Sequence, residues 1–139
     1  MSMRLRPMAG PDLAAVARLE EALFGEEAWS ADMLAAELAA AGTGRYYLVA
    51  EEGGVLAGYA GLLAPGGGQA DVLTIGVSED RWGNGIGTAL LTGLLAEARR
   101  RGCGEVYLEV RVDNERAQRL YRQLGFADHH GYHYRVATT

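Results

Sequence analysis

The sequence predicts a mixed α/β fold, built as a single domain over residues 1–139. Runs with the period of an amphipathic helix are interspersed with β-prone runs, in the order strand, two helices, three strands, helix, strand, helix and two strands. Apolar residues form 49% of the chain and charged residues 22%, which is the balance of an ordinary globular domain. A glycine-rich junction between a long apolar strand and the longest helix is the densest local signal.

The first third of the chain is expected to hold a short strand and two helices. Residues 3–6 alternate apolar and charged side chains, as a short strand does. Apolar side chains recur at helical spacing over residues 13–24, and Gly25 follows as a stop. Ser30 has the side-chain chemistry of an N-cap, so a second helix is expected over residues 31–41.

Three β-prone runs follow these helices. Residues 45–51 and 55–63 are joined by a short segment with Gly53 and Gly54, which predicts a tight hairpin. Residues 69–77 are mostly apolar and form a longer run than a solvent-facing hairpin strand needs.

The second half of the chain alternates helices and strands. An amphipathic helix is expected over residues 86–101, with arginines in its last turn, where cations suit the helix dipole. Residues 105–111 alternate as a strand, and a short helix then ends at Leu124. Two short strands, over residues 126–130 and 132–137, complete the pattern.

Composition and charge exclude several classes of function. Cys103 is the single cysteine, so no intramolecular disulfide can form, and a cytoplasmic protein is expected. No run approaches the roughly 18 apolar residues of a membrane span, so no membrane partner is expected. The net charge of −5 argues against nucleic-acid binding, whereas the 9 arginines and 6 acidic residues of 81–139 suit a small phosphorylated ligand.

The glycine-rich junction reads Trp-Gly-Asn-Gly-Ile-Gly over residues 82–87. Glycines at the start of a helix let backbone N–H groups turn toward an anion at the positive end of the helix. The spacing lacks the last glycine of the dinucleotide fingerprint, and the chain has no Lys to complete a P-loop. Both standard nucleotide motifs are therefore excluded, and a purely structural turn stays open as the alternative.

The order of elements and this junction resemble the GNAT acetyltransferase superfamily over essentially the whole chain. The acetyl-CoA signature of that family is Gln/Arg-x-x-Gly-x-Gly/Ala, which Gly85 and Gly87 match, whereas Trp82 stands where Gln or Arg is usual and Arg81 lies one place earlier. The resemblance implies a mixed, mostly antiparallel central sheet of about six to seven strands flanked by about four helices. It also implies acetyl-CoA as co-substrate, bound mainly by backbone N–H groups.

Within the superfamily, the chain resembles the ribosomal-protein-alanine N-acetyltransferases, the RimI type. The segment LEVRVDN at residues 108–114, followed by Leu120-Tyr121 and by Leu124-Gly125-Phe126, carries most of this resemblance. Ala28-Trp29-Ser30 and the segment LTIGV at residues 73–77 support it. The resemblance implies that Glu109 is the general base, that Asn114 contacts the cofactor and that Tyr121 protonates the leaving thiolate.

Elementary acid–base chemistry agrees with these two catalytic roles. An α-amine has a pKa near ~7.7–8.0, so a carboxylate such as Glu109 needs to remove little to expose the lone pair. The phenol of Tyr121, with a reference pKa near ~10, is protonated at neutral pH. Attack on the thioester would then be direct, without an acyl-enzyme. The structural alternatives are a solvated surface carboxylate at Glu109 and a packing role for Tyr121.

The remaining candidate residues surround the junction or the acceptor. Trp29 and Tyr132 are candidates for substrate binding. The candidates for cofactor binding, besides Asn114, are Ile75, Val77, Trp82, Gly83, Asn84, Gly85, Gly87 and Thr88. His129, His130 and His133 have no spacing of a known zinc motif, so no metal site is expected.

The expected acceptor is a primary amine, most simply a protein N-terminal α-amine such as that of a ribosomal protein. Two alternatives stay open: a small-molecule amine, such as a polyamine or an aminoglycoside, and a catalytically silent acyl-CoA-binding module. A monomer and a homodimer are both compatible with the sequence.

Overall fold

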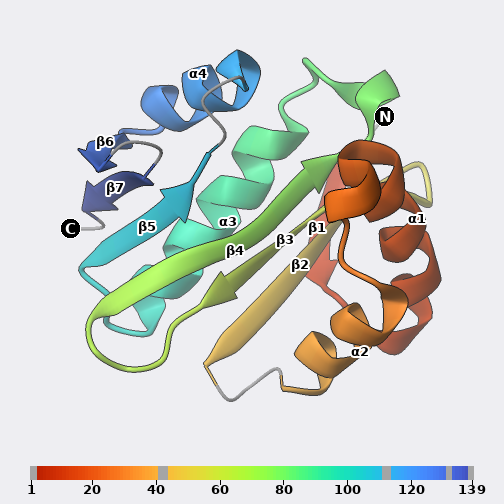
Figure 1. Ribbon diagram of the computed structural model, residues 1–139, viewed down its shortest axis with the longest axis horizontal. Helices are drawn as coiled ribbons and strands as arrows, with labels where there is room; N and C mark the ends of the chain where they lie inside the picture. Colours follow the sequence, from red (N-terminus) through yellow and green to blue (C-terminus); the bar gives the residue numbers. More distant parts are fainter. Residues whose placement is uncertain (1–2, 41–43, 111–113, 131–132, 138–139) are drawn as a thin grey trace.

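Figure 1 shows the computed structural model, which describes residues 3–40, 44–110, 114–130 and 133–137, with side chains described as far as Ala127. The strands are β1 (Met3–Pro7), β2 (Arg45–Glu52), β3 (Val55–Leu63), β4 (Gln69–Val77), β5 (Glu105–Glu109), β6 (Ala127–His130) and β7 (His133–Ala137). The α-helices are α1 (Leu13–Phe24), α2 (Ala31–Ala39), α3 (Ile86–Arg100) and α4 (Glu115–Gln123). The predicted mixed α/β fold is confirmed.

The strands join in one sheet in the order β1-β2-β3-β4-β5-β7-β6. Neighbouring strands are antiparallel except β4 and β5, which are parallel and pair over Gln69–Asp71 and Glu105–Tyr107. β4 continues to Val77 beyond this pairing, and Figure 1 shows the two strands diverging toward their carboxyl ends. Ligands of sheets with parallel strands bind at such carboxyl ends, so this divergence places the candidate site.

Helices cover both faces of the sheet. One core lies between the sheet and α3, and its buried side chains include Leu90, Leu91 and Leu94. The second core lies beneath α1 and α2 and includes Val16 and Leu34. The middle of β2 alternates between the two cores, which explains why a strand buried on both faces is apolar without interruption.

Two side-chain caps begin helices next to the candidate site. The hydroxyl of Ser30 accepts the backbone N–H of Met33 at 3.1 Å, as predicted for the start of α2. The Oδ1 atom of Asn114 accepts the backbone N–H of Ala117 at 3.0 Å and begins α4. α2 ends at Ala39, two residues before the predicted end.

Two glycines without a turn role are explained by close packing across elements. A Cβ atom on Gly93 of α3 would lie 2.8 Å from Cδ1 of Leu48 on β2. A Cβ atom on Gly61 of β3 would overlap the ring of Tyr47, also on β2. Glycine at these positions therefore brings α3 and the aromatic side chain against the sheet.

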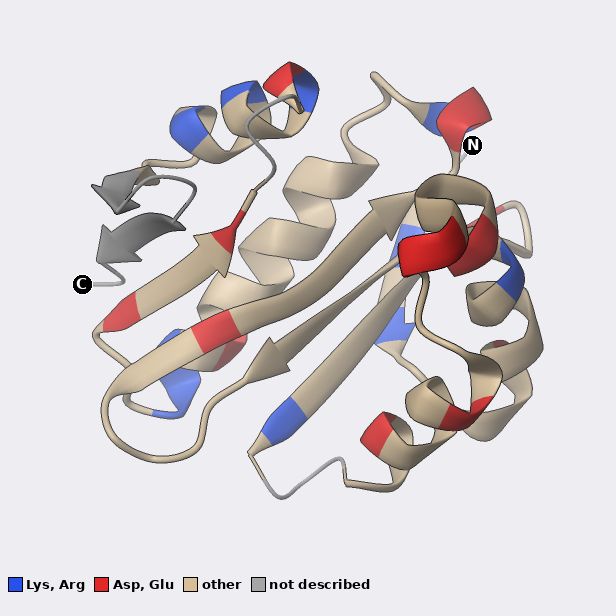
Figure 2. Ribbon diagram, viewed as in Figure 1, with Lys and Arg blue, Asp and Glu red and all other residues tan. Residues whose placement is uncertain are grey.

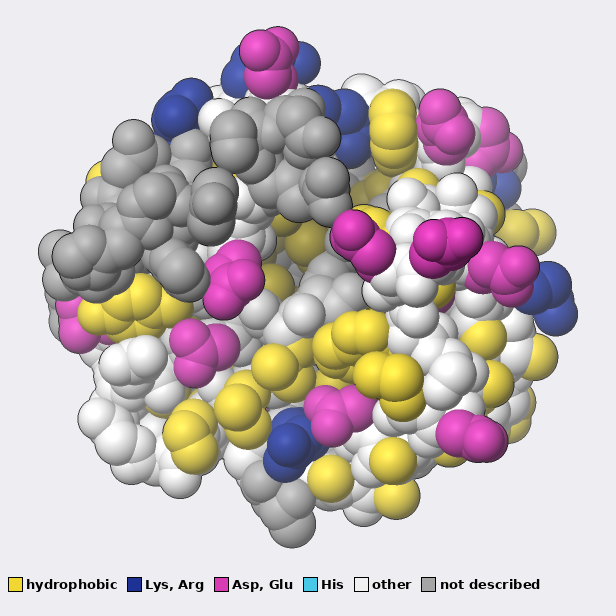
Figure 3. All heavy atoms as spheres, viewed as in Figure 1, with side chains coloured by type: hydrophobic (Ala, Val, Ile, Leu, Met, Phe, Trp, Pro, Cys, Tyr) yellow, Lys and Arg dark blue, Asp and Glu magenta, His cyan; other side chains and the backbone are white. Residues whose placement is uncertain are grey.

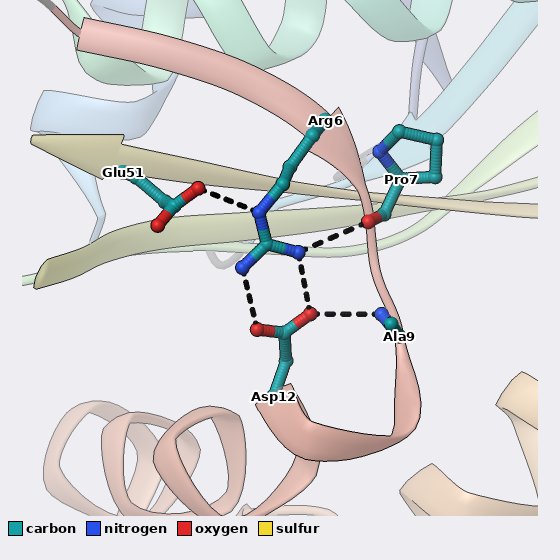
Figure 4. A network of polar contacts seen from close by, with 5 residues as sticks. All are labelled: Arg6, Pro7, Ala9, Asp12 and Glu51. Carbon is teal, nitrogen blue, oxygen red and sulfur yellow. Dashed lines mark hydrogen bonds and ion pairs between the residues drawn. The ribbon is translucent and has the colours of Figure 1, made fainter. Parts of the chain in front are cut away.

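A partly buried ion network joins the start of the chain to the sheet (Figure 4). Arg6 of β1 donates to both carboxylate oxygens of Asp12, at 2.8 and 2.7 Å, and its Nε donates to Glu51 of β2 at 2.6 Å. Asp12 also accepts the backbone N–H of Ala9 at 2.8 Å. Hydrogen bonds from Arg6 hold the pKa of Asp12 below its usual range, although burial opposes this shift.

We expect Asp12→Asn to lower the free energy of unfolding by roughly 1–3 kcal/mol at pH 7, because a bidentate charge-assisted pair is lost. Since the folded-state pKa lies below the unfolded value of about 3.9, this contribution is complete above the unfolded pKa and is lost as the pH falls through the folded one. Urea unfolding in steps from pH 7 to pH 3 should therefore show the difference from wild type narrowing in acid. Glu21→Gln, on the exposed side of α1, is the control. A difference that stays constant down to pH 3 contradicts the assignment.

Within the described residues, no helix has the length and apolar character needed to cross a bilayer.

Candidate active site

The glycine-rich junction lies between the carboxyl end of β4 and the first turn of α3. Gly83 and Gly85 have φ angles of +84° and +80°, a region that side chains other than glycine rarely adopt. Gly85 is the N-cap of α3 and has no side chain to accept from the first-turn N–H groups. The junction therefore presents backbone donors and the positive end of a 15-residue helix to an anion.

A cavity of about 330 Å³ lies against this junction. Arg116 and Arg119, on one side of α4, line it together with the junction glycines. Within the described part of the chain, neither guanidinium forms an ion pair with a carboxylate. Figure 2 shows the concentration of basic residues along α4. The cavity thus combines backbone donors with two cations and suits phosphate groups.

A cleft of about 500 Å³ continues from this cavity between β4 and α4. The two share five lining residues, namely Val77, Gly87, Arg116, Arg119 and Leu120. Ile75 and Trp82 line the cleft as well, so both candidates lie where a cofactor chain would run. The size of the cleft is within the range of ligand sites in proteins, roughly 300–1,000 Å³.

A smaller pocket of about 240 Å³ adjoins the far end of the cleft. Phe24, Ile75, Asn114 and Tyr121 line both spaces. Glu109, the last residue of β5, and Trp29 line the smaller pocket but not the cleft. Figure 3 shows acidic side chains on either side of the hollow in this face of the molecule. The smaller pocket is the candidate acceptor pocket.

The structure brings Glu109 and Tyr121 to the same acceptor pocket from different elements. Glu109 is exposed at the end of β5, where the divergence from β4 leaves its side chain facing the pocket. Tyr121 of α4 is 6% exposed and packs with its ring centroid 6.0 Å from that of Phe126. Burial raises the pKa of Tyr121 to about 12, against an opposing effect of the Arg116 cation. The phenol is therefore protonated throughout the neutral range.

The Trp82 side chain is held by contacts from two other elements, β4 and α4. Its indole N–H donates to the backbone carbonyl of Val77 at 2.9 Å, and the guanidinium of Arg116 lies 4.0 Å from its ring centroid. Arg81, one place earlier, forms an ion pair with Glu52 at 2.6 Å. Arg81 is thus engaged by the β2–β3 hairpin.

The other candidates are distributed around these cavities. Thr88 and Gly87 line the phosphate-sized cavity, and Asn84 is exposed in the junction between Gly83 and Gly85, which line it. Tyr132 lies outside the described residues, as do the side chains of His129, His130 and His133. The roles expected of Tyr132 and of the histidines therefore stay predictions.

A family model described as the acetyltransferase (GNAT) family matches residues 13–126. The chain belongs to this family. The expectation of an N-acetyltransferase is confirmed at this level, and the match spans the cleft, the glycine-rich junction and both candidate catalytic residues. The candidate site of this acetyltransferase lies where β4 and β5 diverge beyond their short parallel pairing.

Relatives of this acetyltransferase include both an N-alpha-acetyltransferase and mycothiol acetyltransferases. It is 43% identical over 119 residues to the N-alpha-acetyltransferase RimI of Mycobacterium tuberculosis, an alignment that covers 83% of this chain and 72% of the relative. It is also 43% identical over 81 residues to a mycothiol acetyltransferase of Clavibacter michiganensis, covering 58% of this chain and 26% of the relative. The chain thus spans about a quarter of that second relative.

Solved structures agree with the fold. The ribosomal-protein-S18-alanine N-acetyltransferase of Escherichia coli superposes with a TM-score of 0.86 at 24% identity, over 99% of this chain and 95% of the other. A PaiA N-acetyltransferase of Thermoplasma acidophilum, solved in complex with coenzyme A, superposes with a TM-score of 0.83 at 20% identity, over 97% of each chain.

Three residues at the site of this acetyltransferase were not predicted from the sequence: Glu20, Arg116 and Arg119. A signal existed for Glu20, because it lies four residues after Val16 and three before Leu23, within the apolar stripe of α1. For the two arginines the signal was weaker, since their spacing of three along a short helix indicates only a shared face.

Glu20 is a buried carboxylate, 2% exposed, at the edge of the acceptor pocket. One oxygen accepts the backbone N–H of Trp29 at 2.8 Å, and the other accepts the hydroxyl of Tyr59 and, at 3.4 Å, that of Thr74. It therefore joins α1 and the segment before α2 to β3 and β4. Glu20 positions Trp29 beside the acceptor pocket.

We expect Glu20→Ala to lower the free energy of unfolding by roughly 2–4 kcal/mol, because buried donors on Trp29 and Tyr59 lose their acceptor. Glu20→Gln, which keeps one acceptor oxygen and the side-chain volume, should lose less. Urea unfolding measures both variants, and Glu21→Ala on the exposed side of α1 serves as control. If Glu20→Ala and Glu21→Ala are equally stable, Glu20 has no such role.

Proposed function

We propose that this acetyltransferase transfers the acetyl group of acetyl-CoA to the α-amine of a protein N-terminus, by direct attack in a ternary complex. The observation that carries the proposal is the meeting of a carboxylate, Glu109, and a buried phenol, Tyr121, at a pocket that opens into the long cleft.

The residues present fit acetyl-CoA. The phosphate-sized cavity has backbone donors at residues 85–88 and the cations of Arg116 and Arg119. The cleft beyond it is lined by Ile75, Val77 and Leu120, whose apolar side chains suit an extended chain of mixed polarity. Acetyl-CoA, when bound, supplies a thioester carbonyl that an amine can attack and a sulfur leaving group.

Glu109 serves in this proposal as the general base. Since an α-amine has a pKa near ~7.7–8.0, an appreciable fraction is already neutral at physiological pH. The carboxylate then accepts the proton that the nitrogen loses on attack, directly or through a water. An exposed position at a strand end suits this role, because the proton must afterwards pass to solvent.

Tyr121 serves as the donor to the departing sulfur. A phenol with a pKa raised to about 12 keeps its proton, whereas a thiol releases its proton near ~8.5. Complete transfer from this phenol to a thiolate is therefore uphill, and the main contribution of Tyr121 is a hydrogen bond that strengthens as negative charge develops on sulfur.

The space beyond the acceptor pocket supports a peptide as acceptor. A groove of about 390 Å³ adjoins Glu109 and is lined by residues of β3, β4 and β5, including Leu63, Leu73 and Tyr107. It shares Leu73, Leu108 and Glu109 with the acceptor pocket, along with Val72. An extended chain whose first nitrogen lies near Glu109 could continue along this groove. The similarity to the RimI enzyme supports the same acceptor class. We propose a ribosomal-protein N-terminus as a candidate acceptor, and the cytoplasm as the site of the reaction.

A small-molecule amine is the second candidate acceptor. The similarity to mycothiol acetyltransferases favours it, since their name indicates a small thiol-bearing molecule. The same base and donor would serve, and the groove along β4 and β5 would then contribute little to binding.

Initial rates on a panel of acceptors distinguish the two. With acetyl-CoA saturating, we expect peptides with a free N-terminal alanine to have a higher kcat/KM than spermidine, an aminoglycoside or a small thiol-bearing amine. A preference for any of the small amines assigns the second function. Calorimetric binding of acetyl-CoA with no acetylated product indicates a silent binding module, and absence of binding contradicts every version of the proposal.

A further inference from the structure

We infer that Arg116 of α4 contributes a side-chain contact to a cofactor phosphate at the glycine-rich junction, and that Trp82 supports this guanidinium. The inference rests on acetyl-CoA binding in the cleft, as proposed above. It concerns only which side chain meets the phosphate at the junction, where Trp82 stands in place of the usual Gln or Arg.

Geometry places the two side chains as a unit. The Arg116 guanidinium lies 4.0 Å from the Trp82 ring centroid, within the distance of a cation–π contact. The ring is itself anchored, because its N–H donates to the carbonyl of Val77 at the end of β4. A guanidinium held over an anchored ring has its position restricted before any ligand arrives.

The location of Arg116 and Trp82 suits binding of a phosphate group. Arg116 lines both the cavity at the glycine-rich junction and the cleft that leads from it, so it lies at their boundary. Partial desolvation lowers the pKa of Arg116, with the Tyr121 side chain opposing the shift and the Arg119 cation adding to it. Two arginines on the same helix side, without a carboxylate partner among the described residues, leave positive charge for a ligand to neutralise.

The other two arginines at the junction are weaker candidates for this phosphate contact. Arg81 lies one residue before Trp82 and lines the cavity, but its guanidinium forms an ion pair with Glu52 at 2.6 Å. Arg119 lines the same cavity and the same cleft, but within the described part of the chain its guanidinium has no ring contact like that of Arg116. The pyrophosphate is the part of acetyl-CoA expected at the junction, where the N–H groups at the start of α3 lie.

Calorimetric titration with CoA and with dephospho-CoA, which lacks the 3′-phosphate, tests the inference without reference to activity. We expect Arg116→Gln to weaken binding of both ligands by roughly 10- to 100-fold, as for loss of a charge-assisted pair with an ionised group. Trp82→Ala should weaken both by roughly 2- to 5-fold, and the double variant should bind no more weakly than Arg116→Gln alone.

Two further variants make the result decisive. Arg122→Gln removes the same charge from an exposed position of α4 outside the three cavities, and it should leave affinity unchanged. Trp82→Arg in the Arg116→Gln background restores a guanidinium at the usual place in the motif and should recover most of the lost affinity. Since Arg116 is exposed, its substitution should lower the thermal unfolding midpoint only slightly, through loss of the contact with the Trp82 ring.

The outcomes separate this inference from the proposed function. If the wild-type chain binds CoA and Arg116→Gln binds CoA and dephospho-CoA as tightly as the wild type does, Arg116 has no such role. A loss for CoA without a loss for dephospho-CoA assigns Arg116 to the 3′-phosphate and overturns the inference. Absence of CoA binding by the wild-type chain overturns the proposed function itself.

Discussion

Tyr121→Phe is expected to lower kcat by about 10²-fold or more while leaving the Kd of acetyl-CoA within a factor of two. The phenyl ring keeps the packing against Phe126, where the ring centroids lie 6.0 Å apart, so the variant should fold as the wild type does. What it loses is the hydroxyl that donates to the departing sulfur. Removal of one well-placed donor to developing negative charge costs roughly 10²–10³ in kcat in other enzymes.

The pH dependence of the wild-type activity gives a second expectation for Tyr121. Because burial raises the pKa of Tyr121 to about 12, the wild-type enzyme should show no loss of activity from phenol ionisation up to about pH 10. Tyr46→Phe, at a half-buried tyrosine on β2, is the matched control and should leave kcat unchanged. An unchanged kcat in Tyr121→Phe removes the phenol from the mechanism and restores its packing role.

Glu109→Gln should lower kcat/KM for the amine by about 10²-fold at pH 7, within the usual range of general base catalysis. The amide is nearly isosteric with the carboxylate but accepts no proton, so binding of acetyl-CoA should be unaffected. The difference from wild type should narrow above about pH 8, where more of the α-amine is already neutral and hydroxide competes as base.

A matched control is available on the same strand. Glu105→Gln alters a carboxylate at the other end of β5, outside the acceptor pocket, and should leave kcat/KM unchanged. If Glu109→Gln and wild type have the same pH–rate profile, Glu109 is a solvated surface residue. Parallel profiles with a constant offset would instead indicate that Glu109 binds the acceptor without removing its proton.

Most of the fold could be predicted from the sequence because it depends on local signals. The start of α2 at Ser30 and the end of α1 at Gly25 follow from the chemistry of single residues and were confirmed. Gly61 and Gly93 had no such signal, because the side chains that require them, Tyr47 and Leu48, belong to another strand. Contacts of this kind appear only once the sheet has formed.

The residues of the candidate site likewise fall into those with a local sequence signal and those that only packing brings together. A short motif contains Glu109 and Tyr121, and the structure places both at one pocket, as expected. Trp82 and Arg116 belong to different elements, and only the packing of α4 beside the junction brings the ring and the guanidinium together. Glu20 had a local signal, an acidic residue within an apolar helical stripe, yet its hydrogen-bond partners are spread over β3, β4 and the segment before α2.

The most direct test of the account is the position of the acetyl group in the product. The protein is incubated with acetyl-CoA and a peptide that has both a free N-terminal alanine and an internal lysine, and tandem mass spectrometry locates the added mass. We expect acetylation at the α-amine, no acetylation at the lysine, and about 10²-fold less product at equal early times in Glu109→Gln and Tyr121→Phe. Acetylation at the lysine alone, or an unmodified peptide with acetyl-CoA bound, would contradict it.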